Sequence, residues 1–357
     1  MNKRQKVAIV GSGKRVKMFY GPILKAMSDQ FDFIGLTSRT KKNREATAEM
    51  FGVTPFSSLN SIREAGADFV IVCVNTESAY DVTSAIVEKG MTALVETPIQ
   101  DPRIVELSKK FGTRISAIEQ WPHLPLEQFK KKVISSGLIG DVFIVENDCR
   151  LLDYHGIAIL RNYFTNNKSS PTHVSGFSTS RSIPTENENV NDNWDVGMVK
   201  FSDDSILIHK FSYQCKSQDN RGIQSVRAIG EKGCIISSSI NQRNNDFETV
   251  HISYNYKGKV ETAKVEFKRE GDITYWIKCD TPEGEIFWNN DFNEKYDIDF
   301  DDHKVGIATQ LLSMRDRNNE FIFDPPYSIS ECYMDNALIH AIKHSAQQGG
   351  TLRVGMI

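Results

Sequence analysis

Short apolar runs alternate with helix-like segments in the first 120 residues. Strands are predicted at residues 7–10 (VAIV), 31–37 (FDFIGLT), 68–74 (DFVIVCV) and 92–96 (TALVE). The run at 68–74 is almost wholly apolar, as is typical of strands covered on both faces of a sheet. Helical patterns separate the strands, at 15–27, 43–51 and 78–89. This alternation predicts right-handed β-α-β crossovers and a doubly wound parallel sheet.

The pattern changes after residue 118. Residues 125–136 (PLEQFKKKVISS) form an amphipathic helical segment, which Gly137 closes. Most segments between residues 142 and 285 then alternate apolar and polar positions with a period of two. Such alternation, broken by turn residues, predicts one large and mostly antiparallel sheet. Two more helices are expected, at 304–314 and 328–346.

These patterns predict an α/β protein of two domains, a number that also suits a length of 357 residues. The first domain covers residues 1–120. The second covers 121–357 and is an α+β domain with a large open sheet. The final helix, about 328–346, is expected to pack back on the first domain. The polar stretch 185–193 (TENENVNDN) is the best candidate for a loop or lid.

The charge balance excludes nucleic acid as the main partner. Lys and Arg number 43 against 46 for Asp and Glu, giving a net charge of −3, whereas phosphate binding needs a large basic excess. The longest apolar run is far shorter than the roughly 18–20 residues that span a bilayer. The charged N-terminus leads into only four apolar residues before Gly11, too few for a signal peptide. We therefore expect a cytoplasmic protein without membrane association, whose six cysteines, lacking C-x-x-C spacing, stay reduced.

A glycine-rich turn follows the first strand. The sequence GSGKRV occupies residues 11–16 and opens a helix. Gly11 permits a tight turn, and Gly13 allows the backbone to approach a pyrophosphate, which the start of a helix attracts. Val16 stands where the third glycine of this fingerprint belongs. The turn and its flanking strands predict a Rossmann dinucleotide-binding domain; the alternative is a purely structural turn.

The end of the second strand bears on which dinucleotide binds. Sites selective for NAD place a carboxylate there for the ribose 2′-hydroxyl. This chain instead has Thr37-Ser38-Arg39-Thr40-Lys41-Lys42. Ser38 and Arg39 suit a 2′-phosphate, and Lys14 and Arg15 add positive charge nearby. NADP is therefore preferred over NAD, unless the basic run is simply a solvated loop.

The order and spacing of several motifs resemble the glucose–fructose oxidoreductase/inositol dehydrogenase (Gfo/Idh/MocA) family. The resemblance covers nearly the whole chain. It rests on GSGKRV at 11–16, VIVCVN at 70–75, EKGMTALVETPI at 88–99, SSGLIGDV at 135–142 and DYHGIAILRNYF at 153–164. It implies a dinucleotide-binding domain followed by a domain with one large open sheet. It also implies a homodimer or homotetramer formed through the free face of that sheet.

Members of this family typically carry Glu-Lys-Pro after the fifth strand, and the Lys bonds the reacting hydroxyl or ketone. Here the triplet is Glu96-Thr97-Pro98. The resemblance implies that Glu96 still borders the nicotinamide. Thr97 can only hydrogen-bond, because it exchanges no proton at neutral pH. Family branches that lack this Lys reduce conjugated or C=N bonds.

The family's later motif, Asp-x-x-x-His-x-x-Asp, is only partly kept. The resemblance places its His at His155, while both acids are replaced, by Leu151 and Ala158. Asp153 and Tyr154 precede the His instead. His155 suits general acid–base chemistry, and Asp153 or Tyr154 could orient it or act as a second donor. The alternative is a histidine that caps or fills the start of a helix.

Residues beyond the family's fourth and sixth strands, here 68–74 and 114–118 (RISAI), complete the cofactor site implied by the resemblance. Gln120 and Trp121 follow the sixth strand, where the family places a polar or aromatic residue against nicotinamide and substrate. Trp121 could stack on a ring, or pack a hinge. The backbone at Val74 and Asn75 would pass along the ribose and nicotinamide.

We therefore predict an oxidoreductase that passes a hydride between nicotinamide and a small polar substrate in the cleft between the domains. A sugar, a sugar derivative and a biosynthetic ketone or imine are the substrate classes. The pyrophosphate is expected at Gly11, Ser12, Gly13 and Lys14. Three alternatives stay open: a redox-neutral enzyme of the NAD-dependent glycosidase type, an imine or conjugated-bond reductase, and a dinucleotide-binding sensor or scaffold without activity.

Overall fold

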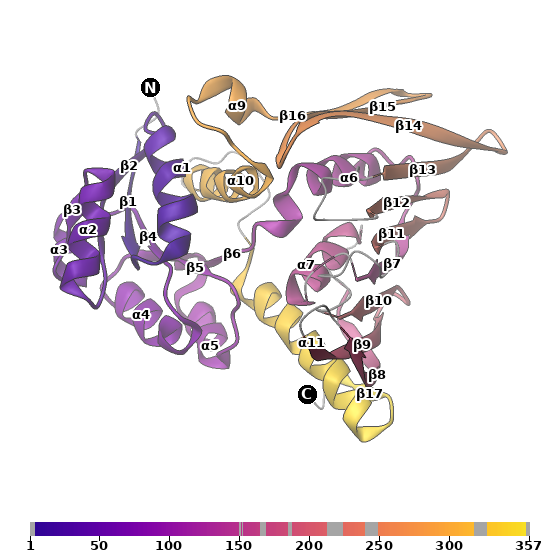
Figure 1. The fold of residues 1–357 in the computed structure, drawn as a ribbon, viewed down its shortest axis with the longest axis horizontal. Helices are drawn as coiled ribbons and strands as arrows, with labels where there is room; N and C mark the ends of the chain where they lie inside the picture. The colour runs from indigo at the N-terminus through magenta and orange to yellow at the C-terminus, as the bar shows by residue number, and fades with distance from the viewer. Residues whose placement is uncertain are drawn as a thin grey trace. The chain divides into compact units, whose positions relative to one another are not determined.

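The computed structural model describes residues 4–149, 151, 153–164, 169–184, 188–212, 224–239, 249–317 and 327–354. The chain forms two compact units (Figure 1). The first consists of Met1–Leu124 and Asp291–Met334, and the second of Pro125–Asn290 and Asp335–Ile357.

The first unit is built on a parallel sheet of six strands in the order β3-β2-β1-β4-β5-β6. The strands are β1 (Gln5–Val10), β2 (Phe31–Thr37), β3 (Thr54–Pro55), β4 (Phe69–Val72), β5 (Thr92–Glu96) and β6 (Ile115–Ile118). Its helical segments are η1 (Val16–Tyr20), α1 (Gly21–Ala26), α2 (Lys41–Phe51), α3 (Leu59–Glu64), α4 (Thr76–Glu88), α5 (Pro102–Phe111), η2 (Gly112–Arg114), η3 (Trp121–His123), α9 (Asp291–Lys295), α10 (Asp302–Arg317) and the start of α11 (Ile329–Gln348). The doubly wound parallel sheet predicted from the sequence is confirmed.

The core of this unit follows from the apolar strands. All four residues of β4 are buried, because helices cover both faces of a parallel sheet. Val72 and Val95 pack in one cluster with Ile86 of α4 and Ile104 of α5. The first residues of α11 join the same cluster through Ile329. These contacts hold the carboxyl ends of β1, β4 and β5 side by side, at the edge where such folds bind ligands.

The second unit contains an eleven-stranded sheet in the order β16-β15-β14-β13-β12-β11-β7-β10-β9-β8-β17. All neighbouring strands run antiparallel except β7 and β10, which are parallel. The strands are β7 (Val142–Asp148), β8 (Pro171–Pro184), β9 (Asn189–Phe201), β10 (Ile206–Phe211), β11 (Gln224–Gly230), β12 (Gly233–Ser239), β13 (Thr249–Tyr256), β14 (Lys259–Glu270), β15 (Ile273–Thr281), β16 (Gly284–Asn289) and β17 (Leu352–Arg353). The predicted large, mostly antiparallel sheet is confirmed.

Helices α6 (Pro125–Ser135), α7 (Asp153–Tyr163) and α11 pack on this sheet. Two glycines let α11 lie close to it, since a Cβ at Gly176 would stand 2.0 Å from the Ile342 carbonyl oxygen and one at Gly197 would strike the Ile342 side chain. Side chains alternate between the faces of a strand, so Phe177 and Met198 point away from α11. Both are exposed.

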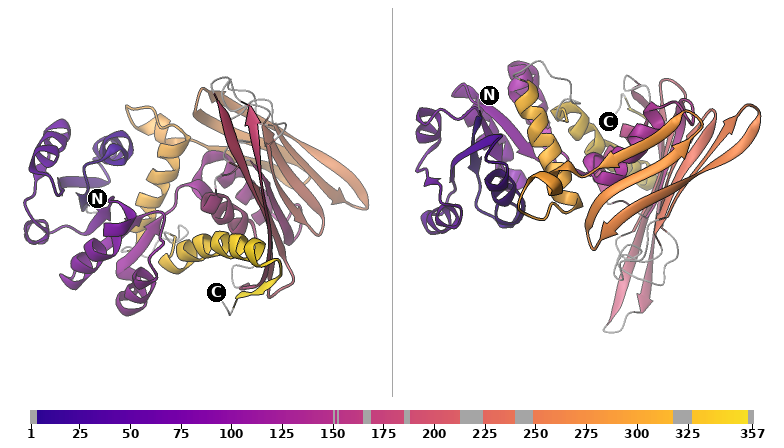
Figure 2. Two further views of the ribbon diagram at one scale, coloured as in Figure 1. Left: turned by 60° about the horizontal axis from the view of Figure 1, so that its bottom comes forward. Right: turned by 90° about the horizontal axis from the view of Figure 1, so that it is seen from above.

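The polar stretch 185–193 differs from the predicted loop. Residues 189–193 belong to β9 and pair with β8, Asn193 opposite Ser180 and Asn189 opposite Pro184; residues 185–187 lie outside the described part of the chain. Figure 2 shows β8 and β9 (pink) as a long two-stranded ribbon. The polar sequence forms a strand because hydrogen bonds between backbones pair it with β8, without need of apolar side chains.

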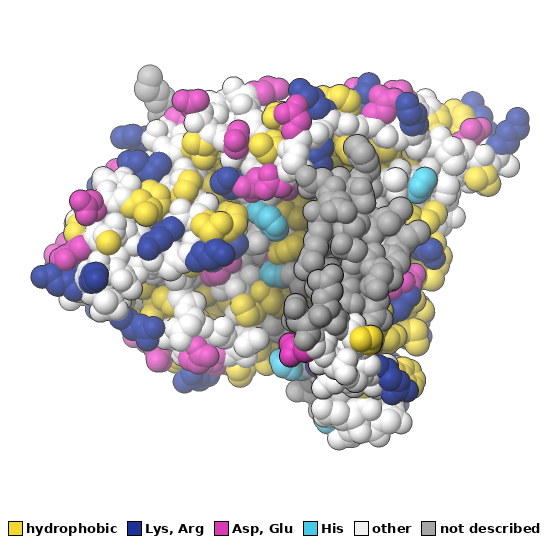
Figure 3. All heavy atoms as spheres, viewed as in Figure 1, with side chains coloured by type: hydrophobic (Ala, Val, Ile, Leu, Met, Phe, Trp, Pro, Cys, Tyr) yellow, Lys and Arg dark blue, Asp and Glu magenta, His cyan; other side chains and the backbone are white. Residues whose placement is uncertain are grey.

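The surface carries charges of both signs. On the face of the first unit seen in Figure 3, Lys and Arg side chains are interspersed with Asp and Glu. No helix in the described part of the chain is long and apolar enough to cross a membrane.

Candidate functional site

The turn after β1 lies at the carboxyl edge of the first sheet. Gly11 has a φ of +141°, an angle that residues with a side chain rarely adopt. A Cβ at this position would stand 2.2 Å from the carbonyl oxygen of Cys73. The Gly11 N–H donates to the Thr37 carbonyl at 2.8 Å. A Cβ at Gly13, by contrast, would meet no atom within 4 Å. Folding therefore requires a glycine at position 11, whereas position 13 borders open space.

The predicted α-helix after this turn is interrupted in its first turns. The N–H of Lys17 donates to the Gly13 carbonyl at 3.2 Å, and the segment Val16–Tyr20 is then a π-helix that becomes α-helical at Gly21. Val16, at the position of the missing third glycine, is fully buried. Its branched side chain needs more room than a glycine would, in keeping with the wider π-helical turn that begins at Val16. Single π-turns of this kind are rare and often lie at functional sites.

This edge fits the diphosphate of a dinucleotide. The first N–H groups of a helix have no partners within the helix, and its dipole favours negative charge. The space beside Gly13 lets an anion approach those groups. Ser12 and Lys14, the remaining predicted residues of the turn, flank that space in the sequence.

Ser38 and Arg39 follow β2 at the same edge. The Ser38 hydroxyl donates weakly to the Thr40 carbonyl at 3.3 Å, and Arg44 donates to the Ser38 carbonyl at 3.4 Å. Arg39 is exposed and makes no hydrogen bond or ion pair with any described residue. A hydroxyl and an uncommitted guanidinium are thus available at the end of β2.

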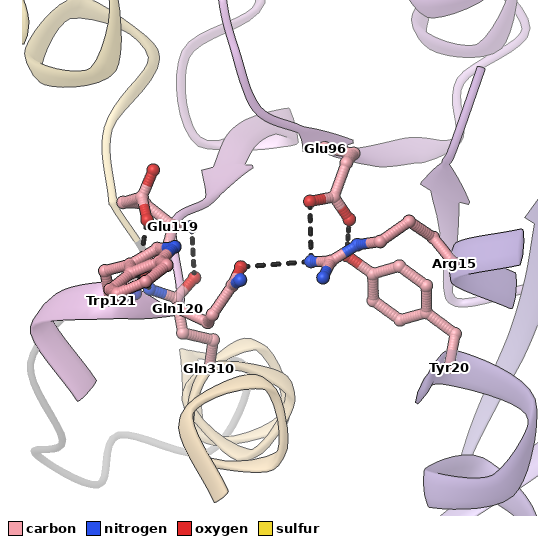
Figure 4. Close-up of polar contacts among 7 residues, drawn as sticks. All are labelled: Arg15, Tyr20, Glu96, Glu119, Gln120, Trp121 and Gln310. Atoms are coloured by element: carbon pink, nitrogen blue, oxygen red, sulfur yellow. Dashed lines mark hydrogen bonds and ion pairs between the residues drawn. The ribbon is translucent and has the colours of Figure 1, made fainter. Parts of the chain in front are cut away.

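Arg15 does not join this group. Its Nη2 donates to Glu96 Oε1 at the end of β5, at 2.8 Å, and to Gln120 Oε1 just beyond β6, at 3.0 Å (Figure 4). The Tyr20 hydroxyl donates to the other Glu96 oxygen. Residues five apart lie nearly on one side of a π-helix, but about 140° apart on an α-helix with 3.6 residues per turn. The π-turn is therefore what directs both Arg15 and Tyr20 at Glu96.

Burial sets the electrostatics of this network, which we call the Arg15–Glu96 network (Arg15, Tyr20, Glu96 and Gln120). Burial raises the pKa of Glu96, although Arg15 and Tyr20 act in the opposite direction. Burial, with Glu96 beside it, also holds the pKa of Tyr20 well above its ordinary value. Burial raises the pKa of the neighbouring Cys73 thiol to about 12, so this cysteine is no nucleophile near neutral pH.

Helix α10 supports the residues that follow β6. The amide of Gln310 donates to the Glu119 carbonyl at 2.6 Å, and its oxygen accepts from the Glu119 N–H at 3.1 Å. A Cβ at Gly306 would stand 2.6 Å from the Gln120 carbonyl oxygen. The Trp121 ring lies edge-on against His303, with centroids 5.2 Å apart. The sequence had singled out Gln120 and Trp121, but no local signal pointed to these partners some 190 residues away.

Three further predicted residues lie near the same ends of strands. Val74 and Asn75 stand between β4 and α4, where the Asn75 amide donates to Glu77 at 2.6 Å. Thr97 directly follows β5, and its peptide bond to Pro98 is cis. The structure thus brings the predicted residues of the first unit to one edge of the sheet.

The predicted proton-handling residues lie in the second unit, at the start of α7. Asp153 has a φ of +30°, and the rings of Tyr154 and His155 are 4.1 Å apart. The side chain of Asn147 on β7 anchors the preceding backbone, accepting from the Leu151 N–H at 2.9 Å and donating to the Leu151 carbonyl at 3.2 Å. A non-glycine residue at positive φ persists only where surrounding contacts enforce it, often at functional positions.

Charged residues that the sequence did not single out surround Asp153. Lys343 on α11 lies 4.0 Å from the Asp153 carboxylate and 3.7 Å from that of Asp195 on β9. Burial raises the pKa of Asp153, while Lys343, His340 and His155 oppose this. His344 follows His340 by four residues, about one helical turn. The structure places His344 against Gln348.

One buried histidine near this segment takes no part in proton transfer at neutral pH. His209 on β10 is fully buried, and its Nδ1 is 3.1 Å from the Asn147 amide nitrogen. Burial lowers the pKa of His209 to about 3, so the imidazole is neutral. The imidazole of His209 also limits the space beside Gly156, since a Cβ at Gly156 would lie 3.2 Å from that ring.

Comparisons with known proteins agree with this architecture. Residues 5–115 match the model of the Gfo/Idh/MocA oxidoreductase family, described as an NAD-binding Rossmann fold. A search of curated proteins found no significant match. Among solved structures, an oxidoreductase from Thermotoga maritima is 18% identical, with 99% of each chain covered and a TM-score of 0.66.

Two further structures cover essentially the whole chain. A putative NADPH-dependent oxidoreductase from Desulfitobacterium hafniense is 16% identical, with 100% of this chain and 99% of that chain covered and a TM-score of 0.69. The transcriptional regulator Gal80p from Kluyveromyces lactis is also 16% identical, with 99% and 95% covered and a TM-score of 0.71. At such identities these likenesses show the fold. The family resemblance is thus confirmed for residues 5–115, which match the NAD-binding Rossmann domain of the Gfo/Idh/MocA oxidoreductase family, and the whole chain shares the fold of these solved structures.

Proposed function

We propose that the protein is a nicotinamide-dinucleotide-dependent oxidoreductase acting on a small polar substrate. The observation that carries this proposal is the glycine turn, where Gly11 at a positive φ and Gly13 beside open space leave room for a diphosphate at the start of a helix. The family match over residues 5–115 supports it.

Calorimetric titration with NADP and with NAD tests the proposal directly. We expect saturable binding of at least one dinucleotide, tighter for NADP. The absence of heat with both the oxidised and the reduced forms would overturn it. Turnover is then sought with polyols and sugars, with ketones, and with imines, since Thr97 departs from the lysine of typical family members.

The preference for NADP rests on the end of β2. Ser38 and the exposed Arg39 offer a hydrogen-bond donor and a positive charge to a 2′-phosphate. No acidic residue stands between Thr37 and Arg44 to bind a ribose 2′-hydroxyl. The similarity to a putative NADPH-dependent oxidoreductase is in keeping with this choice.

A bound nicotinamide would supply hydride transfer, and the protein would orient the cofactor and manage the proton. Cofactor contacts are assigned to Gly11, Ser12, Gly13, Lys14, Ser38, Arg39, Val74, Asn75, Glu96, Thr97, Gln120 and Trp121. Thr97 would donate a hydrogen bond without exchanging a proton. His155 would give or take the proton, with Asp153 or Tyr154 orienting it or acting as a second donor.

A second candidate is a dinucleotide-binding regulator without turnover. Thr97 at the position of the family's lysine favours it, as does the likeness to a transcriptional regulator. Normal dinucleotide affinity with no turnover across the substrate panel would support this function over the first.

The uncovered face of the large sheet is the proposed surface for a homodimer or homotetramer. Phe177 and Met198 expose apolar side chains on it, and such surface is usually covered by a partner. Light scattering measures the oligomeric state. The cytoplasmic location stays a prediction, which fractionation of cells tests.

A further inference from the structure

Arg15 is held in one orientation on the surface of the first unit. Its Nη2 hydrogen-bonds both Glu96 and Gln120 (Figure 4). Its guanidinium also lies over the Phe19 ring at 4.9 Å. Because contacts on two sides fix a long side chain, little entropy is lost when a further partner binds it.

The same guanidinium is only partly used. Within the described part of the chain, Nε and Nη1 of Arg15 make no hydrogen bond. The Arg15 side chain is 31% exposed, against 13% for its partner Glu96. If Arg15 served only to neutralise Glu96, its side chain could be as buried as that of Glu96. Here the carboxylate is buried, and donors of the guanidinium remain open to a ligand.

The position of Arg15 separates it from the predicted phosphate sites. In the sheet order, β2 lies on one side of the β1–β4 pair and β5 on the other. Ser38 and Arg39 follow β2, whereas Arg15 reaches Glu96 at the end of β5. If a dinucleotide extends along this edge from β2, Arg15 stands toward its reacting end.

We propose that Arg15 is a substrate-binding residue, whose free guanidinium edge takes the carboxylate of an acidic substrate. The inference rests on the proposed function, since it names the substrate class of that site. Arginine suits this role because its planar donors match the two oxygens of a carboxylate.

The surroundings of Arg15 strengthen such an interaction. The guanidinium lies over the Phe19 ring at 4.9 Å and over the Tyr20 ring at 5.9 Å, so two aromatic rings border it. A charge beside apolar surface is less screened than one in water. Glu96 offsets part of the charge of Arg15 through their ion pair at 2.8 Å.

Binding of matched acids and amides tests the proposal. The probes are malonate and L-tartrate, with malonamide and tartramide as neutral counterparts, titrated by calorimetry with and without NADP. We expect each acid to bind at least tenfold more tightly than its amide. Arg15→Gln should weaken acid binding about 10- to 100-fold, as expected for lost charged hydrogen bonds, and leave amide binding unchanged.

Three further variants guard this test. Lys17→Gln removes an exposed charge from the same helical segment and should change nothing. Arg15→Lys keeps the positive charge but loses the planar pair of guanidinium donors. Its affinity for the acids should therefore lie between those of the parent and Arg15→Gln. The double variant Arg15→Gln/Glu96→Gln avoids leaving a buried carboxylate unpaired, and should behave as Arg15→Gln does.

Each contrary result has a distinct meaning. No saturable binding of either acid, or equal affinity in the parent and Arg15→Gln, overturns the substrate role. Weaker NADP binding in Arg15→Gln with unchanged acid binding also overturns it, by assigning Arg15 to the cofactor. Because the free edge is present without cofactor, acid binding remains measurable if the dinucleotide fails to bind, in which case only the proposed function falls.

Discussion

At the scale of single residues, the side chains that follow the ends of the strands decide which ligands the protein can bind. Arg39 is exposed and uncommitted, and Arg15 is fixed and partly exposed, although both belong to basic stretches of the sequence. Their different contacts give them different proposed partners. A basic run alone could not distinguish these roles, since each arginine has the same intrinsic chemistry.

Replacing Arg39 with Ala should weaken NADP binding more than NAD binding. The guanidinium is expected to contact only the 2′-phosphate, and a lost charged hydrogen bond costs about 1.5–3 kcal/mol, or roughly 10- to 100-fold in affinity. Calorimetric titration with both dinucleotides measures the ratio. An equal loss for both would remove Arg39 from phosphate recognition.

Replacing His155 with Ala should lower turnover about 100-fold or more and leave the cofactor Kd unchanged, because general acid–base catalysis contributes about 10²–10⁴-fold. Steady-state rates and fluorescence titration separate the two effects. Unchanged turnover would mean that His155 serves only the start of α7.

The Asp153 carboxyl should make stability depend on pH. Burial raises the pKa of Asp153, so the folded chain holds its proton more tightly than the unfolded chain. Stability is therefore lost as pH rises from the ordinary Asp range, about 4, through the raised pKa. In Asp153→Asn this loss disappears, so the Tm of the variant minus that of the parent should increase between pH 4 and 7. A difference that stays constant or falls would contradict this environment for Asp153.

At the scale of elements, the first β-turn-helix unit shows how one turn serves both folding and binding. Gly11 lies against the Cys73 carbonyl, whereas Gly13 faces open space. The π-turn between Val16 and Tyr20 then directs two side chains at Glu96. The same element therefore contributes a diphosphate cradle and the fixed arginine.

Alanine at each glycine should separate these two tasks. Gly11→Ala forces a side chain into a strained φ and against a carbonyl oxygen, so the Tm should fall by several degrees. Gly13→Ala should keep the Tm of the parent but weaken dinucleotide binding, because the new Cβ enters the cradle. Thermal melts and titrations of both variants measure this. The expectation fails if Gly13→Ala binds NADP as the parent does.

At the scale of the whole molecule, the two units keep their helices in place by different means. The first relies on an apolar cluster that joins β4, β5, α4, α5 and the start of α11. The second adds a buried ion pair, in which Arg161 of α7 donates to Asp335 of α11 at 2.6 Å. Asp335 is almost wholly buried, so its charge depends on that partner.

Arg161→Met should therefore destabilise the protein by about 3–5 kcal/mol, because it removes the cation that is paired with a buried carboxylate. The double variant Arg161→Met/Asp335→Leu should recover part of the loss, since no charge then remains buried. Denaturant unfolding of both variants measures the difference. Equal stability of the single variant and the parent would show that other groups compensate Asp335.

Much of the fold was predictable because its signals are local. The apolar strands at 31–37 and 92–96 have the predicted bounds, and the alternating segments after 142 form the predicted sheet. The π-helical segment Val16–Tyr20 was not predicted, because the helical pattern of residues 15–27 indicated a single α-helix. Residues 189–193 were read as a loop from polar composition, yet backbone pairing with β8 makes them a strand.

The sequence by itself determined the glycine turn, the two kinds of sheet and the candidate residues at the ends of strands, since spacing and periodicity act between near neighbours. Only the tertiary structure decided which side chains meet. Arg15, Glu96 and Gln120 converge from three separate strand ends, and Lys343 reaches Asp153 across 190 residues of chain. Such contacts depend on how elements pack, a property that no short stretch of sequence carries.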